Sequence, residues 1–78
     1  MIITFKLFAS ARDKIGQSSI SFEAEELVLS SFIKILQKQH QNYDFSICSF
    51  AKDGEYIDIN SRLNNNDVIF VIPPVSGG

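Results

Sequence analysis

The sequence has few of the residues from which metal centres and hydrolytic active sites are usually built. It contains one cysteine, Cys48, one histidine, His40, and no tryptophan. One Cys and one His do not supply the four ligands of a structural zinc site, and the isolated histidine leaves no Ser-His-Asp arrangement. A single cysteine excludes an internal disulfide framework, which is typical of proteins in a reducing compartment. We therefore expect no metal site and a cytoplasmic location.

Clustered positive charge and long hydrophobic runs are also absent. The seven basic residues are scattered and the net charge is −2, whereas nucleic-acid-binding domains concentrate Lys and Arg on one surface. No apolar run approaches the roughly 20 residues that span a membrane, and the first five residues lack the basic start of a signal peptide. We expect neither nucleic acid nor a membrane as a partner.

The length of 78 residues allows one small domain with little material for a deep pocket. A hydrophobic content of 45% predicts that this domain folds. A chain of this size is better suited to being bound by a larger enzyme than to forming an active site of its own.

Hydrophobic periodicity predicts a first hairpin and one main helix. Strands are expected at 2–8 and 17–22, joined by a short turn of helix at 9–15 that Gly16 ends. Apolar residues with helical spacing then predict a helix from near Glu26 to Gln39. The residues that set this spacing are Val28, Phe32, Ile35 and Leu36.

The second half of the sequence predicts three more strands. A third strand is expected at 45–52, followed by an Asp53-Gly54 hairpin turn and a return strand at 55–59. After a polar loop at 60–66, a strongly β-prone strand covers 67–72, and Pro73-Pro74 ends it because proline cannot donate to a ladder.

The predicted fold is α+β, with a mixed sheet of about five strands and one main helix packed on one face. The first and last strands are placed side by side in the centre, since either would expose apolar residues at an edge. Residues 1–72 form the domain, and 73–78 form a flexible tail. The predicted core consists of Ile3, Phe5, Leu7, Val28, Phe32, Ile35, Leu36, Ile69 and Val71.

The sheet face opposite the helix is predicted to carry an apolar cluster. Side-chain alternation places Phe8, Phe70 and Ile72 there, with Tyr56 beside them. An exposed apolar cluster on a small domain usually indicates a partner surface. The alternative is that the 60–66 loop or the first hairpin covers it.

The C-terminal segment Pro73-Pro74-Val75-Ser76-Gly77-Gly78 is the most informative feature. Its six residues reach at most about 20 Å when extended, and two terminal glycines can enter a channel too narrow for any side chain. A partner enzyme can activate a terminal carboxylate with ATP as an acyl-adenylate, from which a sulfur nucleophile displaces AMP. The alternative is a frayed terminus.

Four segments together carry a family resemblance. They are Leu7-Phe8-Ala9-Ser10-Ala11-Arg12, Asp53-Gly54-Glu55-Tyr56, Asn66-Asp67-Val68-Ile69 and the segment 73–78. Over essentially its whole length the chain resembles the MoaD family, the small sulfur carrier subunits of molybdopterin synthase, which have the ubiquitin-like β-grasp fold. It departs from the family at Asn64-Asn65-Asn66, which replaces the more usual Gly-Asp-type turn, and at Lys52, where the family tends to have an apolar residue.

The resemblance implies a sulfur-donor subunit that is not an enzyme by itself. A MoeB-like adenylyltransferase would adenylate Gly78, and a sulfurtransferase would supply the sulfur of a thiocarboxylate. A MoaE-like large subunit, in a heterotetramer, would pass that sulfur to cyclic pyranopterin monophosphate. No cofactor is held permanently; AMP and sulfur are transient on Gly78. Gly77 gives clearance, and the partner-binding residues would be Phe8, Arg12, Tyr56, Phe70, Ile72, Pro73, Pro74, Val75 and Ser76.

Other interpretations stay open at this point. The same fold serves sulfur carriers for the thiamin thiazole or thiolated tRNA, protein modifiers conjugated through Gly78, and plain interaction domains. Arg12 has two readings, an ion pair with Asp13 or Glu55 and a contact with an acidic partner. Cys48 is expected to be structural, because no basic neighbour lowers its pKa.

Overall fold

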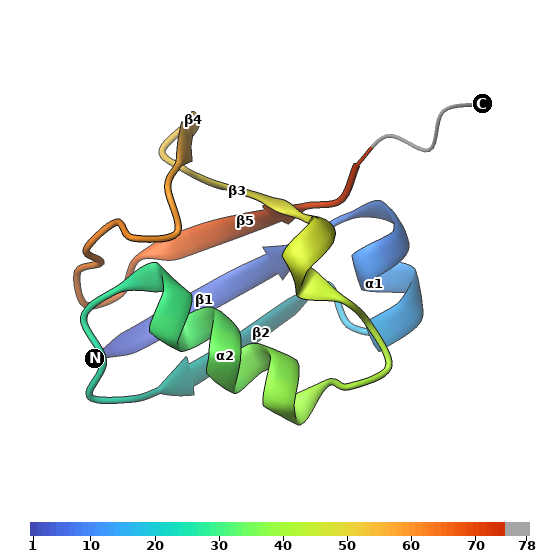
Figure 1. The fold of residues 1–78 in the computed structure, drawn as a ribbon, viewed down its shortest axis with the longest axis horizontal. Coiled ribbons are helices and arrows are strands. Elements are labelled where there is room, and N and C mark those ends of the chain that lie inside the picture. The colour runs from blue at the N-terminus through green and yellow to red at the C-terminus, as the bar shows by residue number, and fades with distance from the viewer. Residues whose placement is uncertain (75–78) are drawn as a thin grey trace.

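Five strands and two α-helices make up the computed structural model, which describes residues 1–74 (Figure 1). A single turn of 3-10 helix, η1, precedes the third strand. The elements in chain order are β1 Ile2–Leu7, α1 Ala9–Ile15, β2 Ser19–Glu23, α2 Leu29–Gln39, η1 Phe45–Ile47, β3 Ser49–Lys52, β4 Glu55–Ile57 and β5 Val68–Ile72.

The sheet has the strand order β2-β1-β5-β3-β4, so the first and last strands lie together at its centre. β1 and β5 run parallel, with Thr4 opposite Val68 and Leu7 opposite Val71, while the other three pairs are antiparallel. The predicted α+β architecture with a central β1–β5 pair is confirmed. In the centre of the sheet, each of the two most apolar strands of the chain has a hydrogen-bonded neighbour on both sides, and neither forms an exposed sheet edge.

Helix α2 covers one face of this sheet (Figure 1), and the hydrophobic core lies between them. Seven of the nine predicted core residues are buried, but Val28 and Ile35 are only partly so. The stripe that enters the core is instead Leu29, Phe32 and Leu36.

The predicted start of this helix near Glu26 is wrong, because α2 begins at Leu29. Val28 is extended, with φ −120° and ψ 141°, and forms an antiparallel bridge with Arg62. The first two N–H groups of the helix have no partner within the helix and donate instead to the loop before β5. The Leu29 N–H donates to the Ser61 carbonyl at 2.9 Å, and the Ser30 N–H donates to the Ile59 carbonyl at 2.7 Å. Backbone carbonyls of a loop that is distant in sequence therefore accept the hydrogen bonds that an N-cap side chain would otherwise accept.

The predicted strand at 45–52 is wrong in its first half, which forms η1. The Asp44 carboxylate accepts from the Ser46 N–H at 3.0 Å, and the Phe45 N–H donates to Gln37 Oε1 at 2.8 Å. These two bonds turn the chain so that Phe45 points into the core, where it is fully buried. The other strand ends shift by one to two residues, with β2 at 19–23 and β4 ending at Ile57.

The Asp53-Gly54 turn is confirmed by the backbone conformation. Asp53 has φ 53° and Gly54 has φ 81°, as a two-residue hairpin with both central residues at positive φ requires. The predicted end of the short helix at Gly16 is also confirmed, since Gly16 has φ 83° and its N–H donates to the Arg12 carbonyl at 2.8 Å.

Lys52 has a specific partner in the fold. Its Nζ lies 3.1 Å from Asp67 Oδ2, and the two side chains are only 23% and 17% exposed. The same carboxylate oxygen accepts from the Asn64 N–H at 2.7 Å. The ion pair therefore ties the end of β3 to the loop that leads into β5.

Candidate functional site

The candidate site is the sheet face that α2 leaves uncovered. One row of residues crosses all five strands on this face, because the registers place Ser19 opposite Lys6, Lys6 opposite Phe70, Phe70 opposite Ala51 and Ala51 opposite Tyr56. The row is polar over β2 and β1 and apolar over β5, β3 and β4. We call this surface the open face.

Aromatic side chains are exposed on the open face. Phe8 and Phe70 are each 39% exposed, and their ring centroids lie 5.3 Å apart. Tyr56, on the short edge strand β4, is 73% exposed, and Ile72 is half-buried. The 60–66 loop leaves these side chains accessible; its buried residue, Leu63, turns toward the core on the other side. The structure thus brings Phe8 and Phe70 together, with Tyr56 two strands away across the row.

A shallow pocket of about 320 Å³ opens at the polar end of the apolar cluster. It is lined by Lys6, Leu7, Phe8, Arg12, Ser18, Ser19 and Phe70. Arg12 Nε lies 3.6 Å from Asp13 Oδ1, with both side chains more than half exposed. Of the two predicted intramolecular partners of Arg12, the structure therefore pairs it with Asp13, although an exposed pair of this kind contributes little to stability.

The chain leaves the sheet beside this pocket. Val71 pairs with Leu7, so the residues that follow β5 emerge next to Phe8, and Figure 1 shows the end of β5 on the same side of the molecule as α1. Pro73 is buried and Pro74 is exposed. Val75, Ser76, Gly77 and Gly78 lie outside the described residues, so the roles predicted for them stay predictions.

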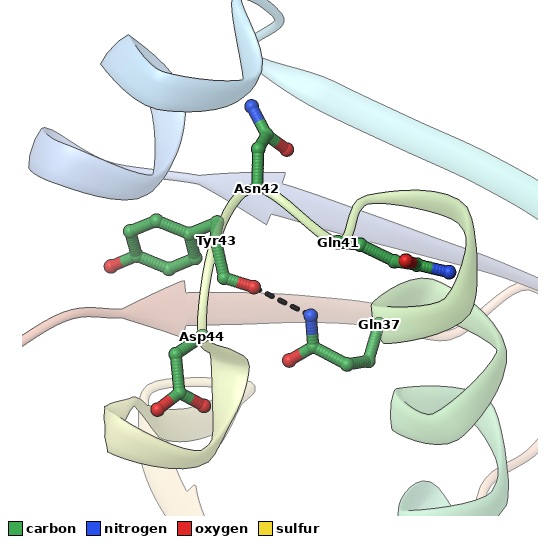
Figure 2. Close-up of a pocket in the computed structure, with 5 residues that line it drawn as sticks. All are labelled: Gln37, Gln41, Asn42, Tyr43 and Asp44. Carbon is green, nitrogen blue, oxygen red and sulfur yellow. Dashed lines mark hydrogen bonds between the residues drawn. The ribbon is translucent and has the colours of Figure 1, made fainter.

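A different hollow, of about 410 Å³, lies where α2 meets the loop before η1 (Figure 2). Figure 2 shows the Gln37 amide directed at the backbone carbonyl of Tyr43, to which it donates a hydrogen bond. The same amide donates to the His40 carbonyl at 3.0 Å and accepts from the Phe45 N–H. Gln37 thus holds the turn between α2 and η1, a structural role that the sequence analysis missed.

Cys48 lies at the C-terminal end of η1, not in a strand as predicted. Burial raises the pKa of its thiol, an effect that a hydrogen bond with the Tyr43 hydroxyl, 3.7 Å away, partly opposes. Burial likewise raises the pKa of Tyr43, whose hydroxyl also bonds to Ser10 at 2.9 Å. A thiol that stays protonated at neutral pH is a poor nucleophile, which agrees with the structural role expected for Cys48.

The described residues contain no group of three or more His, Cys, Asp or Glu side chains placed to hold a metal ion. Within residues 1–74, neither α-helix has the length and hydrophobicity needed to cross a membrane.

Comparisons with known proteins agree with the geometry. A curated relative, the molybdopterin synthase sulfur carrier subunit of Dictyostelium discoideum, is 36% identical over 78 residues, covering 92% of this chain and 91% of the relative. A putative molybdopterin converting factor subunit 1 from Pyrococcus furiosus superposes with a TM-score of 0.81 at 26% identity, covering 96% of this chain and 99% of that one.

Two further solved structures match this chain over its whole length and over the whole of their own chains. One is a complex of subunits 1 and 2 of molybdopterin-converting factor from Helicobacter pylori, with a TM-score of 0.73 and 28% identity. The other is SAMP1 from Haloferax volcanii, with a TM-score of 0.83 and 18% identity; it shows the likeness of fold alone. The predicted β-grasp fold is confirmed by these superpositions. The ThiS family model matches residues 5–78, and the chain therefore belongs to the ThiS family.

Proposed function

We propose that this protein is the sulfur carrier subunit of a molybdopterin synthase. The observation that carries the proposal is the match to the Dictyostelium sulfur carrier subunit over nearly the whole of both chains. The family match extends through residue 78 and so includes the terminal Gly77-Gly78.

In the proposed reaction sequence, the reacting atom is the carboxylate carbon of Gly78. An adenylyltransferase joins this carboxylate to AMP, and ATP loses pyrophosphate. A sulfurtransferase persulfide then attacks the acyl carbon and AMP leaves, and a thiol reductant cleaves the resulting acyl disulfide to leave a thiocarboxylate. On the large synthase subunit that sulfur finally bonds to cyclic pyranopterin monophosphate, and water cleaves its bond to the acyl carbon, which returns Gly78 to a carboxylate. In this scheme the chain supplies no acid, base or metal ligand, and a domain without a deep enclosed site is sufficient.

The open face is the surface that we propose docks the large subunit. The Helicobacter structure is a complex of subunits 1 and 2 of molybdopterin-converting factor. The open face here carries exposed Phe8 and Phe70 next to the point where the tail leaves the sheet, and exposed Tyr56 two strands away. A partner that covers these aromatic side chains would therefore also receive the tail. Pro73, buried at the end of β5, would set the direction in which the tail departs.

Delivery of the sulfur to the thiamin thiazole or to tRNA is the alternative within the same chemistry, since membership of the ThiS family is compatible with each destination. Conjugation to lysines as a protein modifier would use the same activated Gly78.

Intact mass spectrometry of the protein isolated from its own cells tests the proposal. We expect a fraction of molecules in which one oxygen is replaced by sulfur, with the change confined to the C-terminal peptide. Lysine-linked adducts would instead indicate a modifier.

A chain lacking Gly78 should remain folded and should fail to support molybdenum-enzyme activity in cells deprived of the native gene. Leu27→Ala, which alters an exposed side chain away from the open face, serves as the control and should support full activity. Undiminished molybdenum-enzyme activity without Gly78 would exclude the proposed function. If that activity were kept and only thiamin synthesis or tRNA thiolation were lost, the sulfur would instead be assigned to that other pathway.

A further inference from the structure

Two cationic residues, Lys6 and Arg12, line the pocket at the polar end of the open face. Lys6 comes from the middle of the sheet, between Ser19 on β2 and Phe70 on β5. Arg12 lies in α1, four residues after Phe8, and its backbone N–H donates to the Phe8 carbonyl at 3.4 Å. Both residues line the same pocket, together with the rings of Phe8 and Phe70.

This positive charge is poorly compensated by the chain itself. Within residues 1–74, Lys6 forms no ion pair, and Arg12 has only Asp13 at 3.6 Å, a neighbour that does not line the pocket. The acidic residue on the same face of β2, Glu23, pairs with Ile2 at the far end of β1, about 13 Å from Lys6 at the rise of a strand. The pocket is thus locally positive on a chain whose net charge is −2.

The walls of the pocket suit one kind of ligand group. The residues that line it include Lys6, Arg12, Ser18 and Ser19, and an ammonium, a guanidinium and a hydroxyl can each donate a hydrogen bond to a carboxylate. The aromatic rings on the other side would exclude water once a partner covers them, and charge pairs are stronger where water is excluded. A carboxylate next to an apolar side chain satisfies both halves of the pocket.

We propose that the pocket of Lys6 and Arg12 receives an Asp or Glu side chain of the protein that docks on the open face, with an adjacent apolar side chain of that protein on Phe8 and Phe70. The identity of this protein as the large synthase subunit rests on the proposed function. The pocket would set the orientation of the docked partner, because it lies beside the point where the tail leaves the sheet.

A charge-reversal experiment tests the pocket. The dissociation constant for the large synthase subunit of the same organism is measured by calorimetry for the unaltered chain, for Lys6→Glu/Arg12→Glu and for Lys34→Glu/Lys38→Glu. The control changes the net charge by the same amount on exposed positions of α2, on the opposite face of the sheet. All three proteins should fold, since the altered side chains are exposed.

We expect the pocket variant to bind at least about 30-fold more weakly, as for the loss of a desolvated charge pair, and the control to stay within about threefold. One Asp or Glu of the large subunit, changed to Lys, should restore binding of the pocket variant by at least about tenfold. Equal affinity of the pocket and control variants, or failure of every such change to restore binding, would overturn the proposal.

Two further outcomes also test the proposed carboxylate contact at the Lys6–Arg12 pocket. If the unaltered chain does not bind the large subunit, the proposed function falls and the pocket proposal with it, whereas binding that both variants retain overturns the pocket alone. In the free full-length chain, nuclear Overhauser contacts between Gly78 and the Arg12 side chain would assign the pocket to the chain's own carboxylate and would likewise overturn the proposal.

Discussion

Replacement of Phe70 by alanine is the most direct test of the open face as a docking surface. Phe70 lies at the centre of the row that crosses the sheet, between Lys6 and Ala51, and central aromatic residues commonly dominate the energy of an interface. Phe70 is 39% exposed in the free chain, so part of its apolar surface is left for a partner to bury.

The expected loss of affinity follows from that exposed fraction. A phenylalanine side chain has an accessible area of roughly 200 Å², of which the exposed 39% amounts to about 80 Å². At about 25 cal/mol per Å² this area contributes about 2 kcal/mol to binding, which corresponds to a roughly 30-fold higher dissociation constant. The substitution also has a cost to folding: the buried remainder of the side chain, about 120 Å², contributes about 3 kcal/mol at the same factor, and loss of the Phe8–Phe70 ring contact adds about 1 kcal/mol.

Calorimetric titration of the large synthase subunit measures the binding, and urea unfolding measures the folding cost separately. Leu27→Ala is the matched control, since Leu27 is 49% exposed but precedes α2, away from the open face. Tyr56→Ala provides a second test with little effect on the core, because Tyr56 is 73% exposed. Affinity of folded Phe70→Ala within twofold of the unaltered chain would refute the assignment of this face.

Three further predictions concern stability, each measured by urea unfolding. Leu36→Ala should lower the free energy of unfolding by about 3 kcal/mol, because Leu36 is fully buried between α2 and the sheet; a loss under 1 kcal/mol would contradict that packing. Lys52→Met should cost about 1–2 kcal/mol, between the values for exposed and buried ion pairs, since it leaves Asp67 without its cation, whereas the exposed control Lys38→Met should cost almost nothing. Burial raises the pKa of Cys48 above its ordinary 9.0, so the folded state holds the thiol proton more tightly than the unfolded state does. The contribution of this thiol to the free energy of unfolding is therefore complete below pH 9 and is lost as pH rises through the folded pKa. Cys48→Ala should therefore make the decline of stability above pH 9 shallower; an identical decline would show that the thiol has no part in it.

The candidate site was predictable from the sequence to the extent that strand alternation governs it. Alternation along residues 2–8 and 67–72 placed Phe8, Phe70 and Ile72 on one face, and the Asp53-Gly54 turn placed Tyr56 beside them. The place of Lys6 in the same pocket as Arg12 was not predictable, because a lysine on the polar side of a strand has the pattern of an ordinary solvated residue. Only the approach of α1 to the end of β5 brings Arg12 to the same pocket.

The sequence by itself determined the number and order of the strands, the two-residue turn, the presence of one main helix and the central place of the two most apolar strands. These features depend on local conformational preference and on the period of the apolar residues, which are written along the chain. Tertiary contacts decided the rest. Helix α2 begins at Leu29 because Ser61 and Ile59 supply carbonyls to its first turn, and residues 45–47 form a 3-10 helix instead of a strand because Gln37 and Asp44 bind their N–H groups. Hydrogen-bond partners that are distant in sequence leave no periodic signal, and for that reason only the folded chain reveals them.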